Sequence, residues 1–230
     1  MSTSVTEELL QVHRLPDRGS RDRAVIDAIL DAGMLCHLGT IRDGRPVVLP
    51  TLYGRDGDRL IVHGSAAARS LRAGAAGLPV CVTVTLIDGL VLARSGFHHS
   101  ANYRSVVVHG EAQLLTDPAA KAAALEVLTE HVAPGRWAQL RPPTDGELKA
   151  TTVLSVPLDH AVAKVRDGGV HDDATDLGAP VWAGVVPLST HLGEPQPDPH
   201  LAPDLTPPTW WDRAGGPARP ATSSPEEVGP

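Results

Sequence analysis

Hydrophobic residues between positions 20 and 33 recur every three or four residues, which is the spacing of one face of a helix. Ser20 stands where a helix cap belongs, and Gly33 stands where a helix commonly ends. We therefore expect a helix within the segment SRDRAVIDAILDAG. Its apolar face consists of Val25, Ile26, Ile29 and Leu30.

From residue 34 the pattern changes to short β-rich runs that are separated by turns. The segment MLCHLGTIRDGRPVVLPTLYG holds two such runs around Asp43-Gly44, a pair that tolerates the positive φ of a tight hairpin. A second turn at residues 55–58 leads to a strand at residues 60–63. These turns predict antiparallel strands joined by short loops.

The run VCVTVTLIDGLVLARSGF alternates at residues 80–85, with valines on one side and Cys81, Thr83 and Thr85 on the other. Such alternation is typical of a strand with one buried face. Asp88-Gly89 then predicts the turn of a second hairpin. The later elements that we expect are a strand at residues 103–115, a helix from Pro118 to about residue 132, a helix near residues 145–150, and strands at residues 152–157 and 161–165.

These elements predict a mainly β (α+β) fold, a small barrel of about seven or eight strands with short helices at its ends. The composition changes beyond Gly168, and proline becomes frequent from Pro195. A Pro-rich segment of this kind buries too little apolar surface to order itself. We therefore divide the chain into a polar N-terminal arm at residues 1–19, a barrel domain at residues 20–190 and an extended Pro-rich C-terminal tail at residues 191–230.

Composition narrows the class of protein. The 230 residues are 42% hydrophobic, and no apolar run reaches the roughly 18 to 20 residues of a membrane-spanning helix. The net charge of −7 and the aromatic content of 3% disfavour a nucleic acid partner. Glu7 and Glu8 stand where a secretion signal would be apolar, and Cys36 and Cys81 are too few for a disulfide framework. We expect a cytoplasmic protein with no membrane contact and two buried, free cysteines.

The order of the motifs is more specific than any one of them. A hairpin is followed by HGSAAARS at residues 63–70, by a long hairpin, and by FHHSANYRSVVVHGEA at residues 97–112. This order resembles the pyridoxamine 5'-phosphate oxidase family over roughly residues 20–190, and its nitroimidazole-reductase-related branch in particular. The resemblance implies a split β-barrel and a homodimer with flavin mononucleotide (FMN) at its interface. Haem or a deazaflavin, which other members of the superfamily bind, are the alternative cofactors.

The resemblance also implies a set of cofactor-binding residues. They comprise a strand that lines the isoalloxazine ring, a strand end beside the phosphate, a phosphate-gripping pair and the start of the long strand. In this order they are Val48, Leu49, Pro50 and Thr51; Val62, His63, Gly64 and Ser65; Arg69 and Ser70; and Arg104 and Ser105. Trp182, in the later apolar run VWAGVVPL, is either a lid over the partner's flavin or an anchor for the tail.

A phosphate site at these positions makes chemical sense. Gly64 and Ser65 precede a short expected helix, so backbone amides and a helix N-terminus would face one point. Arg69 follows one turn later and can pair with the anion in a bidentate way. The alternative is a solvated arginine on a surface helix. Pro50 and Ser70 stand where the oxidase that names the family has lysines, and its C-terminal tryptophan-and-arginine signature is not recognisable, so vitamin B6 oxidation is not expected.

His63 is the candidate catalytic residue, because it matches a histidine near the flavin in the nitroimidazole-related branch. Three roles are open for it: an acid–base group, a haem axial ligand, or a polar residue at a strand end. His98 and His99 are further candidate haem ligands, whereas His109 is expected to be a barrel residue. No spacing of cysteine and histidine indicates a metal-ion site.

No serine, cysteine or aspartate has the setting of a nucleophile, so any chemistry would belong to the cofactor. The function that we expect is an FMN-binding oxidoreductase that passes electrons from a nicotinamide to a small acceptor such as a nitro compound or a quinone. The alternatives are a haem-binding protein of the same fold and a non-enzymatic flavin-binding or sensing module.

Overall fold

The computed structural model describes residues 7–65, 77–202 and 204–208. The chain divides into two compact units, residues 1–189 and 190–230, and all helices and strands described lie in the first. The α-helices are α1 (Arg23–Ala32), α3 (Pro118–Val132) and α4 (Asp145–Ala150), and the 3-10 turns are η1 (Glu7–Leu10), η2 (Pro16–Arg18), η4 (Gly96–His98) and η5 (Trp137–Gln139). The strands are β1 (Gly19–Ser20), β2 (Leu35–Arg42), β3 (Arg45–Asp56), β4 (Arg59–Ser65), β5 (Leu78–Leu92), β6 (Ser100–Leu114), β7 (Thr151–Pro157), β8 (Ala161–Arg166) and β9 (Gly184–Pro187).

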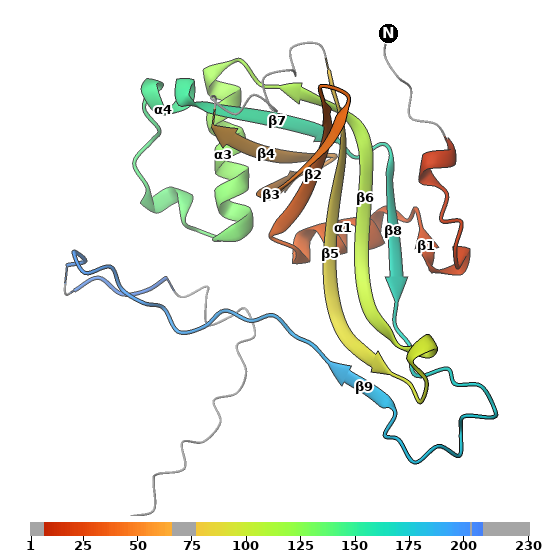
Figure 1. The fold of residues 1–230 in the computed structure, drawn as a ribbon. Helices are drawn as coiled ribbons and strands as arrows, with labels where there is room; N and C mark the ends of the chain where they lie inside the picture. Colours follow the sequence, from red (N-terminus) through yellow and green to blue (C-terminus); the bar gives the residue numbers. More distant parts are fainter. Residues whose placement is uncertain (1–6, 66–76, 203, 209–230) are drawn as a thin grey trace, which may run out of the picture. The chain divides into compact units, whose positions relative to one another are not determined.

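The strands form a closed antiparallel barrel with additions at one end (Figure 1). The order β6-β7-β4-β3-β2-β5 closes on itself because β5 also pairs with β6. The second half of β5 and the first half of β6 extend beyond the barrel, where β8 and β1 continue the sheet from β6 and β9 continues it from β5. This architecture confirms the predicted split β-barrel with short flanking helices.

Most of the expected elements occur where the patterns placed them. The Asp43-Gly44 turn joins β2 to β3, and both residues have positive φ (50° and 71°). The helices α3 and α4 and the strands β7 and β8 agree with the expected ranges within one or two residues. In the N-terminal region η1, η2 and β1 are additional elements, and β9 lies within the isolated apolar run VWAGVVPL.

The expectation of a turn at Asp88-Gly89 is wrong. The strand β5 continues through this point with a bulge between Ile87 and Gly89, and the hairpin turns only after Leu92. The Asp88 carboxylate accepts two hydrogen bonds from Arg104 on β6, at 2.9 and 2.7 Å. Because a bidentate Arg–carboxylate pair fixes both partners, the extra residue is absorbed as a bulge instead of a turn.

The helix α1 packs its predicted face against the barrel. Ile26, Ile29 and Leu30 are buried, whereas Val25 is only partly buried at the edge of the core. The helix begins later than expected, because its cap is Asp22, whose carboxylate accepts a hydrogen bond from the Ala24 amide at 2.9 Å.

The helix α3 lies close against β3 because Gly54 has no side chain. A Cβ atom on Gly54 would stand 2.8 Å from the Cα of Leu128 and 3.0 Å from the carbonyl oxygen of Val127. One residue away, Tyr53 is completely buried, its hydroxyl donates to the Leu30 carbonyl at 2.5 Å, and its ring lies 4.9 Å from that of His131. The packing of α3 against the barrel therefore depends on Tyr53 and Gly54, which are adjacent in sequence.

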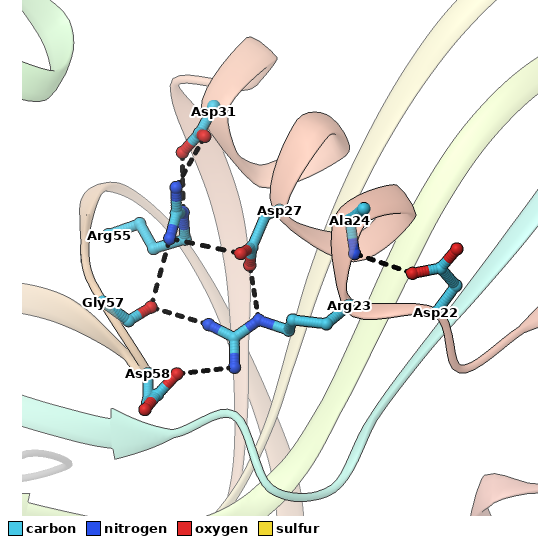
Figure 2. Close-up of polar contacts among 8 residues, drawn as sticks. All are labelled: Asp22, Arg23, Ala24, Asp27, Asp31, Arg55, Gly57 and Asp58. Atoms are coloured by element: carbon cyan, nitrogen blue, oxygen red, sulfur yellow. Dashed lines mark hydrogen bonds and ion pairs between the residues drawn. The ribbon is translucent and has the colours of Figure 1, made fainter.

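A network of ion pairs connects α1 to the turn between β3 and β4 (Figure 2). Arg55 donates two hydrogen bonds to Asp31, both at 2.6 Å, and also lies 3.5 Å from Asp27. Arg23 donates to Asp27 at 2.6 Å and lies 2.8 Å from Asp58 in the turn. The hydrogen bond from Arg55 is the largest influence on the Asp31 carboxyl and lowers its pKa below the ordinary 3.8.

We expect Arg55→Met to lower the free energy of unfolding by about 1 kcal/mol. Arg55→Lys should lower it by more than half of that amount, because an ammonium group cannot form the bidentate contact with Asp31. Urea unfolding at pH 7 measures the difference. The matched control is Arg59→Lys, since Arg59 meets Asp56 through a single 3.3 Å contact and about half of each side chain is exposed. Equal stabilities of wild type and Arg55→Lys would show that the fork geometry contributes nothing.

Candidate functional site

The first half of β3 has one edge without a strand partner in the described part of the chain, called the free edge below. Residues 45–52 pair with β2 on one side, but β4 pairs only with Tyr53–Asp56 on the other. No strand in the described part of the chain pairs with the remaining edge of residues 45–52. Its backbone N–H and C=O groups can therefore bind a flat ligand that presents donors and acceptors along one edge.

The predicted ring-lining residues lie on this free segment. Val48 is 60% exposed, and Leu49 and Pro50 are also exposed, whereas Thr51 is half-buried. Because side chains alternate along a strand, Val48 and Pro50 share the face that points away from the barrel interior. An exposed apolar strand of this kind is the surface that a ligand or a second subunit would cover.

His63 lies at the end of β4, beside this segment. The Thr51 hydroxyl stands 3.4 Å from the His63 carbonyl oxygen, so the structure brings these two predicted residues together. The imidazole is half-buried, and its Nδ1 atom is buried without a hydrogen-bond partner among the described residues. Burial lowers the pKa of His63, which keeps the ring neutral near pH 7. A buried nitrogen without a partner is uncommon in folded proteins, so His63 is a candidate for contact with a bound group.

The predicted phosphate site is described only in part. Gly64 and Ser65 continue β4 and pair with Thr152 and Thr151 of β7, and the Val62 side chain is buried in the core. The backbone of Val62 lies between two partner strands, opposite Tyr53 of β3 and Leu154 of β7. Arg69, Ser70 and the expected helical turns lie outside the described residues. Their role stays a prediction from the resemblance.

The remaining predicted residues lie elsewhere in the sheet. Arg104 pairs with Asp88, and the Ser105 hydroxyl donates to the Lys164 carbonyl at 3.2 Å. Both are on β6, which β2 and β5 separate from β3. Trp182 is 64% exposed, and its indole packs over Gly184 at the start of β9. Within one chain these residues and the β3 segment are therefore not neighbours.

The two adjacent histidines lie at the tip of the β5–β6 hairpin, each with one ring nitrogen near an oxygen atom. The Nδ1 atom of His99 lies 2.8 Å from the Ser95 carbonyl oxygen. The Nε2 atom of His98 lies 3.2 Å from the Asp173 carboxylate, outside hydrogen-bond geometry but within ion-pair distance. Among residues 7–65, 77–202 and 204–208, no three metal-ligating side chains come together.

An apolar cavity of about 390 Å³ is the feature that the sequence did not indicate. It opens on the outer faces of β2, β5 and β6, with Leu9 of η1 at its margin. Cys81 lies on its wall and is half-buried, unlike the fully buried Cys36, so the expectation of two buried thiols holds for Cys36 only. Burial raises the pKa of the Cys81 thiol, so it is not a thiolate near pH 7. The other lining residues include Gly39, Ile41, Val48, Pro79 and His109.

Comparison with known proteins connects this geometry to a family. A sequence model of the pyridoxamine 5'-phosphate oxidase family matches residues 22–165. The structure of the flavocytochrome Anf3 from Azotobacter vinelandii is 39% identical, with a TM-score of 0.83 over 90% of this chain and 96% of that one. The structure of an FAD and haem binding protein from Mycobacterium smegmatis is also 39% identical, with a TM-score of 0.80 over 86% of this chain and 97% of that one.

A more distant similarity agrees at the level of the fold. A protein described as a 5-nitroimidazole antibiotic resistance protein from Bacteroides thetaiotaomicron is 23% identical, with a TM-score of 0.53 over 64% of this chain and 86% of that one. The comparison with curated proteins found no match. No helix in the described ranges has the length and apolar character needed to cross a membrane.

Proposed function

The chain belongs to the pyridoxamine 5'-phosphate oxidase family, and on that basis we propose that it is a flavocytochrome that binds one flavin and one haem. The observation that supports this most is the 39% identity, over 90% and 86% of the chain, to two proteins that are named for a flavin together with haem. This proposal joins the expected flavin to the haem that was its alternative.

His63 is the residue that would hold the haem iron. An axial histidine uses one neutral ring nitrogen for the metal, and its pKa must allow that form near pH 7. His63 meets both requirements, since burial lowers its pKa and its Nδ1 atom has no partner among the described residues. His99 fits less well because its Nδ1 atom already lies 2.8 Å from the Ser95 carbonyl oxygen, and His98 fits less well because its Nε2 atom lies 3.2 Å from the Asp173 carboxylate, although it forms no hydrogen bond there.

The free edge of β3 fits the flavin ring. Its backbone groups can hydrogen-bond the polar edge of an isoalloxazine, and Val48 and Pro50 provide an apolar surface against the ring. FAD is the flavin that we favour over FMN, because FAD is named for one of the 39% identical structures. Gly64, Ser65 and Arg69 stay the candidate phosphate ligands.

The chemistry would be electron transfer. A bound flavin accepts two electrons at once and releases them singly, and a haem accepts one at a time. The residues of this chain would hold the two groups beside each other on β3 and β4 and keep water away from them through the exposed apolar strip. We retain a nicotinamide as donor and a nitro compound or quinone as acceptor, in a cytoplasmic homodimer with the cofactors at its interface.

The visible spectrum of the purified protein tests the cofactors directly. We expect flavin absorbance together with a Soret band, and a flavin released by acid whose mass is that of FAD. Release of FMN instead of FAD would change the identity of the proposed flavin and leave the rest of the proposal as it stands. A colourless protein that takes up neither added FAD nor added haem would contradict the proposal, and cofactor binding without oxidation of NADH or NADPH by any acceptor would favour a sensing module.

A further inference from the structure

A glycine in the middle of a row of cross-strand partners makes the outer face of the sheet hollow. The row runs from β3 through β2 and β5 to β6 (Figure 1), and its members are Val48, Gly39, Cys81 and His109. Leu38 and Thr40 are buried, so strand alternation directs position 39 outward. Since glycine has no side chain, the neighbouring side chains surround an empty space, the cavity of about 390 Å³, called the Cys81 cavity below.

The Cys81 cavity has the size and the lining of a small-molecule site. Such sites commonly have volumes of about 300–1,000 Å³ and apolar walls with a few polar groups that orient the ligand. The apolar wall here includes Ile41, Val48 and Pro79. The thiol of Cys81 and the imidazole of His109 are polar groups among its described lining residues. We therefore expect a ligand of the size of a small aromatic compound.

The charge of the lining narrows the chemistry of that ligand. The described residues that line the cavity include no lysine and no arginine, and they do include the carboxylate of Glu111. A phosphate group would need a cation or a cluster of backbone amides, so the cavity disfavours a nicotinamide dinucleotide with its pyrophosphate. The lining therefore suits an uncharged electron acceptor better than the nicotinamide donor.

His109 can supply a hydrogen bond that orients an uncharged acceptor. Burial is the largest influence that lowers the pKa of His109, and the charge of His160 lowers it further, so the imidazole is neutral near pH 7. A neutral imidazole still carries one N–H donor. It can therefore donate to the oxygen of a nitro group or of a quinone without the cost of a full charge on an apolar wall.

We propose that the Cys81 cavity binds the electron acceptor, an uncharged planar aromatic compound whose oxygen atom accepts a hydrogen bond from His109. The proposal rests on the proposed function and adds the place of the acceptor and the chemistry that selects it. Val48 lines the cavity and also belongs to the apolar strip on β3. A ligand in the cavity would therefore lie beside a flavin ring bound along the free edge, and electron transfer requires such proximity.

Alkylation of the two native thiols tests occupancy of the cavity without any turnover. Iodoacetamide at alkaline pH should modify the half-buried Cys81 much faster than the fully buried Cys36. A probe at about ten times its dissociation constant should slow the modification of Cys81 about tenfold, because about one cavity in ten stays empty. The probes are 4-nitrobenzyl alcohol for a nitro acceptor and 2,3-dimethyl-1,4-naphthoquinone for a quinone. Peptide mass spectrometry measures both thiols in one sample.

A variant that fills the cavity completes the test. Ile41 is a lining residue whose side chain is 62% exposed, so Ile41→Trp should fold normally and place an indole where the ligand would lie. It should weaken the binding of either probe by at least about tenfold. The matched control is Ile87→Trp, on β5 outside the lining and 54% exposed, which should bind the probes as wild type does.

Three results would overturn the proposal. One is a Cys81 that reacts as slowly as Cys36 without a probe, because another part of the protein or a bound cofactor would then fill the cavity. Another is protection of Cys81 by NADPH and by neither probe. The third is equal protection in Ile41→Trp and Ile87→Trp. The visible spectrum of each sample reports on flavin and haem, so failure of the acceptor site is distinguished from failure of the proposed function.

Discussion

His63→Ala is expected to weaken haem binding by more than about 100-fold while flavin absorbance stays. Changes in groups that only support a metal ligand cost about 10- to 100-fold in affinity, so loss of the ligand itself should cost more. The reason lies in the environment of this side chain, whose neutral ring carries a buried Nδ1 atom without a partner among the described residues. Haem titration followed at the Soret band measures the affinity.

The matched control is His99→Ala, because His99 is exposed and only its Nδ1 atom approaches a neighbour, the Ser95 carbonyl. It should bind haem as wild type does. Circular dichroism of both variants separates a lost ligand from a lost fold. An unchanged Soret band in His63→Ala would remove this residue from the haem site, and loss of the band in His99→Ala instead would move the site to the hairpin tip.

Gly54→Ala is expected to cost about 3 kcal/mol of unfolding free energy, which corresponds to a fall of about 6–12 °C in Tm. The added methyl would stand 2.8 Å from the Cα of Leu128 and 3.0 Å from its amide nitrogen. These are backbone atoms of α3, so the clash cannot be relieved by rotating a side chain. Either the helix or the strand must move, and the neighbouring Tyr53 contacts move with it. Scanning calorimetry measures the change.

Gly110→Ala is the comparison for this effect. Gly110 is also a strand glycine, on β6, but the nearest atom to an added Cβ is the Pro157 carbonyl oxygen at 3.9 Å, an ordinary contact. Its Tm should stay within a few degrees of the wild-type value, since strand glycine replaced by alanine without a clash is close to neutral. Equal losses in the two variants would mean that α3 adjusts freely over β3.

The local sequence pattern predicted correctly those elements whose local preference agrees with the contacts that they make in the fold. The apolar spacing of Ile26, Ile29 and Leu30 predicted the buried face of α1, and the positive φ that Asp43 and Gly44 tolerate predicted the β2–β3 turn. Asp88-Gly89 has the same residue types as the Asp43-Gly44 turn, but in the structure it forms a bulge within β5. The difference is Arg104, sixteen positions later, whose bidentate contact no local window contains.

Part of the candidate site was also predicted from the sequence, and part was not. The resemblance led to the β3 segment and to His63, and the structure places these side by side through Thr51. The cavity could not be found from the sequence, because Gly39, Cys81 and His109 come from three separate strands. The alternation at residues 80–85 did place Cys81 opposite the core-facing valines, yet alternation says nothing about whether the outer face is flat or hollow.

The free edge of β3, for which the described ranges hold no partner strand, has a consequence for chains that have not yet bound a cofactor. A row of free peptide groups next to exposed Val48 and Leu49 is a template onto which another chain can add a strand. A flavin ring bound along that edge would occupy the template. When newly made chains outnumber the available cofactor, the chains left without cofactor would be the ones that aggregate. Supply of flavin and haem during synthesis, rather than the stability of the barrel, would then limit the yield of usable protein.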